Sequence, residues 1–272
     1  MKKIFTMTAA ALSAYIKSVL RNFGYAPQVA TGRFIYAPGN LPVMLVAHLD
    51  TVHPSPPVNI FHDREEGVMW SPEGLGADDR AGVLAALHVL GYGFRPHVLF
   101  CDLEESGGLG AREAVERLSR PDVAFILELD RQGADDYVLY GWRSPELEAL
   151  LERHGFRRTS GSFSDIAVLC PSWRIPGANL SVGYYCQHTR GEYLRLPELY
   201  RTAARVCKML QELPADPARF SYAKDRRIVD YWDYDYEYYD DMTFNTAVGL
   251  VKGASPKKIQ NFERSVLKNV QR

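Results

Sequence analysis

The sequence lacks the features that define several classes of protein. Its 272 residues include only four cysteines, which are far apart and form no CxxC pair: Cys101, Cys170, Cys186 and Cys207. This spacing excludes a disulfide framework or a zinc ribbon as the basis of the fold. No apolar run approaches the roughly 18 residues that a membrane-spanning helix needs, and no apolar signal-peptide core follows Lys2 and Lys3. We therefore expect a cytoplasmic protein with no membrane partner.

An excess of charge of either sign is also missing. The chain has 32 basic and 33 acidic residues, and its formal net charge is −1. A balance so close to zero gives no electrostatic attraction to nucleic acid, which is therefore not expected as a partner. Hydrophobic residues make up 46% of the chain and charged residues 24%. This composition is typical of a globular protein that is large enough to fold without cross-links.

Apolar runs of strand length alternate along the chain with amphipathic runs of helical length. The expected strands are 33–36, 43–47, 67–70, 98–105, 123–127, 137–140 and 179–183. The expected helices are 6–23, 83–90, 109–118, 145–154 and 197–213, while 162–175 is ambiguous. This alternation predicts an α/β fold, a three-layer sandwich with a mostly parallel mixed central sheet and helices on both faces.

Side chains that can bind metal lie at the ends of the expected strands. They are His48, Glu104, Glu105, Asp130 and His188. Because the carboxyl ends of parallel strands meet at one edge of a sheet, we expect these residues to lie close together. Neighbouring carboxylates are costly to bury unless a cation compensates their charge. The sequence therefore predicts a metal site at this edge.

Two pairs of residues at these strand ends have a spacing that suggests separate tasks for the two members. His48 and Asp50 share a face of a strand, so Asp50 can hold one imidazole nitrogen while the other points to a metal. Glu104 and Glu105 are adjacent, and on an extended strand they point to opposite faces. One of them can then bind an ion while the other moves a proton.

Two further acids, Asp78 and Asp79, follow a Gly-Leu-Gly-Ala turn and precede an apolar run. They either cap a helix, or one bridges two ions while the other supports the structure. Two histidines with three or four carboxylates can hold two divalent ions. This donor set suits zinc first, with cobalt or manganese as substitutes. With Glu104 as an unligated base, the predicted reaction is hydrolysis of an amide.

Four motifs resemble, in order, those of the co-catalytic zinc exopeptidases, the group that contains the peptidase families M20, M28 and M42. The motifs are His48-Leu-Asp50-Thr-Val, Gly76-Ala-Asp78-Asp79-Arg-Ala-Gly, Glu104-Glu105-Ser-Gly-Gly-Leu-Gly and Gln187-His188-Thr189. The similarity extends over residues 40–210.

The resemblance implies a role for each motif residue. His48 and Asp130 would bind one zinc ion, Glu105 and His188 the other, and Asp78 would bridge the two. Glu104 would be the general base and Asp50 the support of His48, and a cis peptide bond would join Asp78 and Asp79. Glu128 shares a strand face with Asp130 and is the alternative ligand.

One part of the M20 carboxypeptidases has no counterpart in the sequence. Those enzymes carry a lid domain before the last histidine, whereas only residues 131–187 lie between Asp130 and His188. No inserted lid domain is therefore expected, and the layout is closest to an M28-like aminopeptidase acting on a small peptide or amide. Two alternatives stay open: an N-acyl amino acid deacylase that uses the same site, and a non-catalytic metal-binding interaction protein.

Some residues outside the motifs remain to be placed. Arg143 is a candidate to meet a substrate carboxylate, and Ser164 and Asp165 either line the substrate pocket or begin a helix. The other histidines match no motif and are expected to be structural or on the surface: His53, His62, His88, His97 and His154.

The chain divides into two parts of different character. Residues 1–214 form the expected catalytic domain, and residues 215–272 form a C-terminal appendage. The appendage has a tyrosine- and aspartate-rich stretch over 230–241 and an expected helix over 255–270. Its aromatic content is unlike that of a solvating acidic tail, so we expect it to pack on the domain or on a partner. Docking on another subunit would make the protein a homo-oligomer.

Overall fold

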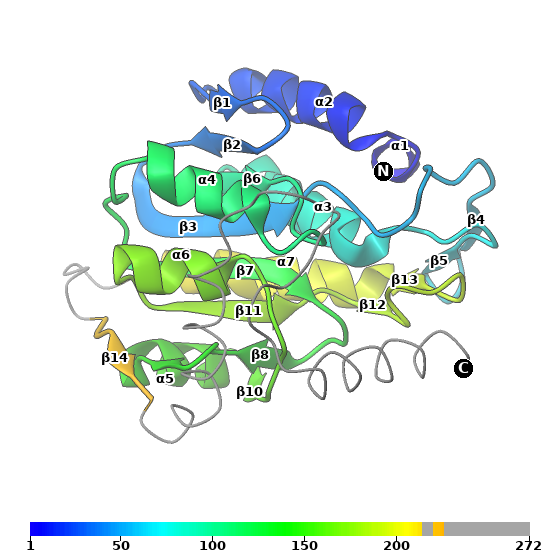
Figure 1. Cartoon of the computed structure of the whole chain (residues 1–272). Helices are drawn as coiled ribbons and strands as arrows, with labels where there is room; N and C mark the ends of the chain where they lie inside the picture. The colour runs from blue at the N-terminus through cyan, green and yellow to red at the C-terminus, as the bar shows by residue number, and fades with distance from the viewer. Residues whose placement is uncertain (214–219, 226–272) are drawn as a thin grey trace, which may run out of the picture. The chain divides into compact units, whose positions relative to one another are not determined.

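The computed structural model describes residues 1–213 and 220–225. The helices, in chain order, are α1 Lys2–Phe5, α2 Ala9–Asn22, α3 Ala77–Gly91, α4 Leu109–Arg117, α5 Pro145–Arg153, α6 Ile166–Trp173 and α7 Leu196–Gln211 (Figure 1). The strands are β1 Gln28–Ala30, β2 Phe34–Ala37, β3 Leu41–His48, β4 Phe61–Asp63, β5 Val68–Trp70, β6 Pro96–Cys101, β7 Phe125–Arg131, β8 Asp136–Val138, β9 Trp142–Arg143, β10 Arg157–Arg158, β11 Gly177–Ser181, β12 Tyr184–Tyr185, β13 Tyr193–Arg195 and β14 Ala223–Lys224.

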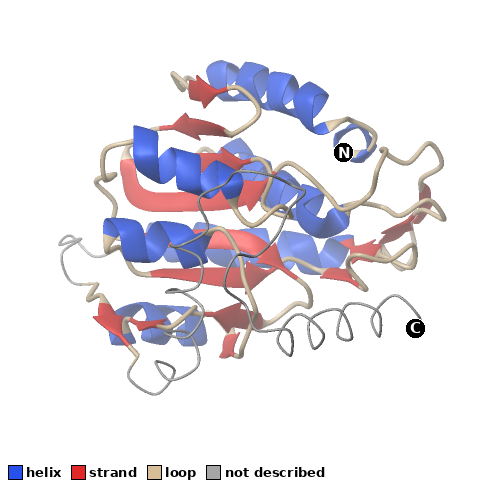
Figure 2. Ribbon diagram, in the orientation of Figure 1, coloured by secondary structure: helices blue, strands red, loops and turns tan. Residues whose placement is uncertain are grey.

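An eight-stranded mixed sheet forms the centre of the molecule, in the order β1-β2-β6-β3-β7-β11-β8-β10. Its four middle strands, β6, β3, β7 and β11, are parallel to one another. β2 and β8 pair with them in the antiparallel direction on either side. Helices lie on both faces of the sheet (Figure 2). The predicted three-layer α/β fold is therefore confirmed.

The central strand β3 shows why the sheet is covered on both faces. Val43 and Leu45 belong to the core that includes α3 and α7, whereas Met44 and Val46 belong to the core that includes α4 and α6. Successive side chains of a strand point to opposite faces, so a strand between two helical layers must be apolar throughout. This explains why the residues before His48 form an uninterrupted apolar run.

A second, smaller sheet has the order β12-β13-β5-β4. The sequence predicts a hairpin ending in residues 67–70, and β4 and β5 form it. The pairing of β13 with β12 and β5 has no clear sequence signal. β12 and β13 enclose residues 186–192, so the small sheet fixes both ends of the loop that carries His188.

The expected strand over 98–105 is wrong in its last part. β6 ends at Cys101, and Leu103 has a φ of 63°, in the left-handed region that strands do not use. Glu104 and Glu105 therefore lie on a turn rather than on opposite faces of a strand. The ambiguous residues 162–175 contain α6, with Asp165 at its N-cap position but without a capping hydrogen bond.

Residues 131–187 form elements of the main domain, from β8 to β12, and the expected absence of an inserted lid domain is confirmed. In the described part of the chain, no helix is both long and apolar enough to cross a membrane. The cytoplasmic location stays a prediction.

Residues 220–225 pack on the main domain. β14 pairs with β9, and the ring of Tyr222 stacks on Trp142 with centroids 4.6 Å apart. The hydroxyl of Ser221 donates to Oε2 of Glu146 at 2.6 Å. The tyrosine- and aspartate-rich stretch and the expected final helix lie outside the described residues, and the expected boundary at residue 214 stays a prediction.

We expect Leu45→Ala to reduce the free energy of unfolding by about 2–5 kcal/mol, because it leaves a cavity in the middle of the sheet. The Leu45 side chain is 1% exposed. Urea unfolding of the purified proteins measures this change. Val58→Ala is the control, since Val58 is 84% exposed and should change stability by less than about 0.5 kcal/mol. Equal effects of the two substitutions would contradict the assignment of the core.

Candidate metal centre

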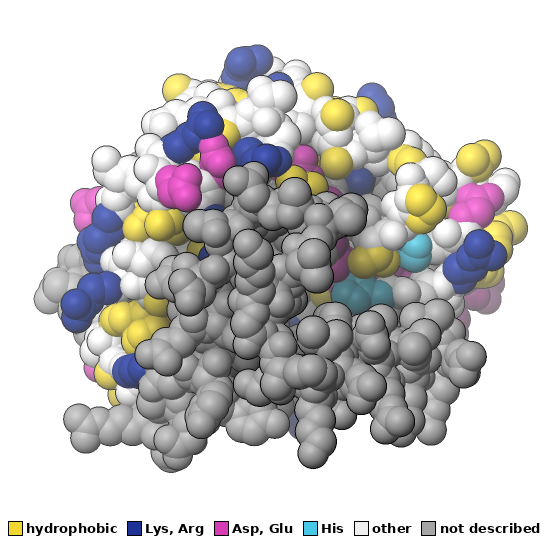
Figure 3. Space-filling model, in the orientation of Figure 1, with side chains coloured by type: hydrophobic (Ala, Val, Ile, Leu, Met, Phe, Trp, Pro, Cys, Tyr) yellow, Lys and Arg dark blue, Asp and Glu magenta, His cyan; other side chains and the backbone are white. Residues whose placement is uncertain are grey.

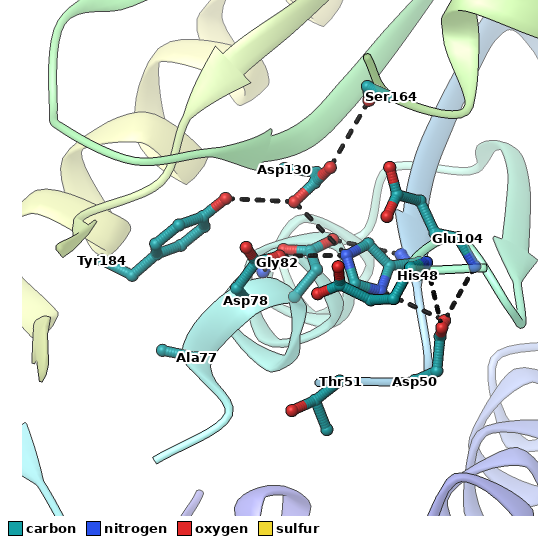
Figure 4. Close-up of polar contacts among 12 residues, drawn as sticks. His48, Asp50, Thr51, Ala77, Asp78, Gly82, Glu104, Asp130, Ser164 and Tyr184 are labelled. Atoms are coloured by element: carbon teal, nitrogen blue, oxygen red, sulfur yellow. Dashed lines mark hydrogen bonds and ion pairs between the residues drawn. The ribbon is translucent and has the colours of Figure 1, made fainter. Parts of the chain in front are cut away.

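His48 lies at the carboxyl end of β3 and is completely buried. Its Nε2 is 3.0 Å from Oδ1 of Asp78 and 3.5 Å from Oδ1 of Asp130 (Figure 4). Its Nδ1 is 3.3 Å from Oδ1 of Asp50. One ring nitrogen therefore faces Asp50, and the other faces the two carboxylates that come from α3 and β7.

Asp78 lies between two histidines. It is in the first turn of α3 with non-helical dihedral angles, and the peptide bond between Asp78 and Asp79 is cis, as the resemblance implies. Its Oδ1 faces Nε2 of His48 at 3.0 Å, and its Oδ2 is 3.1 Å from Nε2 of His188. The two oxygens of one carboxylate thus face two different imidazoles.

Potential ligands gather in overlapping groups. The ligand atoms of His48, Asp78 and Asp130 all lie within 4.8 Å of one another, and so do those of Asp78, Glu105 and His188. A third group within the described residues joins His48, Glu104 and Glu105. The first two groups share only Asp78. The structure thus brings together the five residues predicted to bind metal and the predicted base, Glu104.

Exposure to solvent changes across the centre. The side chain of His48 is 0% exposed, that of Glu105 13%, and that of His188 52%. Figure 3 shows histidine and acidic side chains at the surface of the molecule. The centre therefore has an enclosed half around His48 and an open half around His188.

Negative charge dominates this region. Burial, together with the neighbouring Asp78, raises the pKa of Asp130 to about 7, and burial chiefly raises the pKa of Glu104 to about 9. Hydrogen bonding to Asp78 is the main cause that raises the pKa of His188 to about 9. The hydrogen bonds of the buried Arg80 go to the backbone oxygens of Ile4 and Met7 rather than to these carboxylates. Clustered carboxylates and imidazole nitrogens at these spacings fit divalent cations.

Asp50 and Asp79 hold the backbone of the ligand-bearing segments. The carboxylate of Asp50 accepts hydrogen bonds from the N–H groups of Glu104 and Glu105, at 3.1 and 3.2 Å. Asp79 accepts the N–H of His48 at 3.1 Å and that of Gly82 at 2.8 Å. Asp50 and Asp79 thus set the positions of other site residues.

Asn179 and Tyr184 hold Asp130, and sequence reasoning missed both. The Asn179 side chain accepts the N–H of Asp130 at 3.0 Å and donates to its backbone oxygen at 2.7 Å. The hydroxyl of Tyr184 donates to Oδ1 of Asp130 at 3.1 Å (Figure 4). The sequence does contain one signal for Asn179: it is a polar residue inside an apolar strand. A polar side chain that is buried in this way needs hydrogen-bond partners.

Glu192 is a further residue that the sequence did not single out. Its side chain is 1% exposed and accepts the N–H groups of Ala77 and Asp78, at 2.9 and 3.1 Å. His53 has its Nε2 3.5 Å from the same carboxylate. The sequence gives only a weak signal for Glu192, because Glu192 is an acidic residue in a short polar segment after His188.

The remaining candidates lie around the centre or away from it. Glu128 is fully buried and pairs with the hydroxyl of Ser164, while the Ser164 hydroxyl is also 3.4 Å from Oδ2 of Asp130. The structure thus places Glu128 behind Asp130 and leaves Asp130 next to His48. Arg143 forms a two-point ion pair with Glu148 on α5, which occupies its guanidinium group.

We expect Asn179→Leu to destabilise the metal-free protein by about 2–4 kcal/mol, because it leaves the buried N–H and C=O groups of Asp130 without these partners. Urea unfolding in the presence of a chelator measures the loss. Asn59→Leu is the matched control at an exposed position and should change stability by less than about 0.5 kcal/mol. A loss below about 1 kcal/mol for Asn179→Leu would show that Asn179 does not hold Asp130.

The model of one protein family matches part of the chain. Residues 35–157 match the model of peptidase family M28. This range includes His48, Asp78, Glu104, Glu105 and Asp130, and it ends before His188. A search of curated proteins finds no match.

Solved structures share the fold at low sequence identity. Aminopeptidase PepT from Bacillus cereus has a TM-score of 0.62 at 15% identity, over 78% of this chain and 96% of that one. A tripeptidase from Staphylococcus aureus has a TM-score of 0.64 at 15% identity, over 77% and 95%. A leucine aminopeptidase precursor from Bacteroides thetaiotaomicron has a TM-score of 0.57 at 16% identity, over 75% and 89%. The family match and the fold together confirm the resemblance of this chain to the co-catalytic zinc exopeptidases.

Proposed function

We propose that the protein is a zinc-dependent exopeptidase of the aminopeptidase type, which removes the N-terminal residue of a small peptide. The observation that carries the proposal is the position of Asp78, with one carboxylate oxygen facing His48 and the other facing His188. A single carboxylate between two imidazoles is the arrangement required to bridge two cations. The match to an M28 peptidase model over residues 35–157 supports the same reaction class.

The two halves of the centre supply the ligands for two ions. His48 and Asp130 hold the first, Glu105 and His188 hold the second, and Asp78 is shared. Imidazole and carboxylate donors suit zinc, with cobalt and manganese as substitutes. A pair of such ions, when bound, lowers the pKa of water and polarises the carbonyl group under attack.

Glu104 is the proposed general base. It lies on the turn after β6, and Asp50 holds its N–H. Its carboxylate belongs to the group with His48 and Glu105, yet it is not needed to complete either of the two groups that share Asp78. Bound cations would offset the neighbouring negative charge and favour the ionised form of Glu104. Glu104 would then accept a proton from the attacking water and deliver it to the nitrogen of the departing peptide.

No lid is inserted between Asp130 and His188, and this layout favours an exopeptidase of the aminopeptidase type. The proposed site residues lie in one domain without an inserted lid, so among the described residues the lid-borne groups that recognise a substrate carboxylate in M20 carboxypeptidases have no counterpart. His188 is half exposed, which leaves one side of the centre accessible to a small substrate. A homo-oligomer stays a prediction, and light scattering of the full chain would determine it.

We expect protein purified without chelator to contain close to two zinc ions per chain, measured by elemental analysis. Removal of the metal should abolish release of the N-terminal residue from aminoacyl amides and short peptides, and added zinc should restore it. N-acyl amino acids belong in the same panel. Turnover of these alone would identify a deacylase, and bound metal without any turnover would contradict an enzymatic function.

We expect Glu104→Gln to reduce kcat about 100- to 10,000-fold, because the amide cannot accept the proton. The zinc content should stay at two ions per chain, since Glu104 is not a ligand in the proposed arrangement. Steady-state kinetics and elemental analysis on the same preparation check both statements. Glu116→Gln, at an exposed position of α4, is the matched control and should keep wild-type activity. Full activity of Glu104→Gln would refute the assignment of the base.

A further inference from the structure

Glu192 connects two parts of the centre that are far apart in the sequence. Its Oε2 accepts the N–H of Ala77 and its Oε1 accepts the N–H of Asp78, with sequence separations of 115 and 114 residues. Glu192 itself follows His188 by four residues, in the loop between β12 and β13. One buried carboxylate thus joins the loop of His188 to the start of α3.

The start of α3 needs such a partner. The N-cap residue is Gly76, which has no side chain to accept the first free N–H groups of the helix. Glu192 meets this need from a distant segment. A capping role alone would make Glu192 a contributor to stability, without an effect on what Asp78 binds.

The contacts of Glu192 do more than cap the helix. The two oxygens of Glu192 contact two consecutive N–H groups, so the carboxylate fixes the direction of the peptide unit that leads into Asp78. His53 lies 3.5 Å from Oε2, and Gly74 lies so close to the ring of His53 that a Cβ there would overlap the ring. Glu192 is therefore enclosed by its partners and has little freedom to follow a shift of the loop.

We propose that Glu192 is a positioning residue that sets the distance between Asp78 and His188 and thereby the affinity of the centre for both metal ions. The inference rests on the proposed metal centre. Side chains that hold metal ligands in place change affinity when they are substituted, without touching the ion. Because Asp78 would bind both ions, a shift in its position should weaken the binding of both. Loss of His188 should weaken the binding of one.

The test is zinc binding by the purified full chain, measured by competition with a chromophoric chelator. Glu192→Gln keeps the size of the side chain but places an NH2 group against one of the two N–H donors. We expect both zinc equivalents to bind 10- to 100-fold more weakly. His188→Ala should weaken one equivalent only. The visible absorption of the cobalt-substituted protein should change in Glu192→Gln as well, since it reports ligand geometry independently of turnover.

Glu148→Gln is the matched control. Glu148 is another buried carboxylate, which pairs with Arg143 and Arg158 and contacts no residue of the centre. Its substitution should lower stability in urea but leave both zinc affinities within twofold of wild type. This comparison separates a loss of stability from a loss of ligand geometry.

The outcomes distinguish this inference from the proposed function. A wild-type protein that binds no zinc would overturn both. Two bound ions in the wild type and unchanged affinities in Glu192→Gln would overturn the inference alone, as would a change in stability without a change in affinity. If Glu192→Gln does not fold, Glu192→Asp is measured in the same way, because the shorter side chain cannot reach both N–H groups. Unchanged zinc affinities in that variant would also overturn the inference.

Discussion

The concentration of negative charge at one edge of the sheet is the constraint on which the rest of the structure depends. Asp78, Asp130 and Glu104 surround a fully buried histidine, and each is about nine-tenths buried. Like charges at this distance repel strongly in a medium of low polarity. They stay together because the surrounding backbone fixes them, and because the same arrangement is suited to cations.

The fixing follows one rule for every proposed site residue except His188. A polar side chain from a distant segment bonds to the backbone of the segment that carries the residue: Asp79 to His48, Glu192 to Asp78, Asp50 to Glu104 and Glu105, and Asn179 to Asp130. Backbone contacts leave the functional atoms of the ligands free. They also fix those atoms in place, which would reduce the cost of organising the site if it binds an ion.

Sequence patterns point to the candidate ligands and to Asp50, but not to Asn179 and Glu192. The apolar run before His48 and the alternation of elements are local signals, and both led to the correct sheet and edge. The positive φ of Leu103 could not be predicted in the same way, because the turn that contains it pairs with Asp50, which lies 54 and 55 positions from the two N–H groups that it accepts. Glu192 and Asn179 act on residues 114 and 49 positions away, and no local pattern encodes such pairs. The small sheet around His188 depends on similar long-range pairing.

His188 departs from this rule. In the described residues, contacts within its loop hold the backbone around it, with the Thr189 hydroxyl donating to the backbone oxygen of Cys186 and accepting the N–H of Gly191. Its side chain is also the most exposed of the proposed ligands. The enclosed half around His48 is thus fixed by the sheet, whereas the open half depends on the loop between β12 and β13. Glu192 joins this loop to Asp78, so the most exposed of the proposed ligands is still tied to the residue that both halves share.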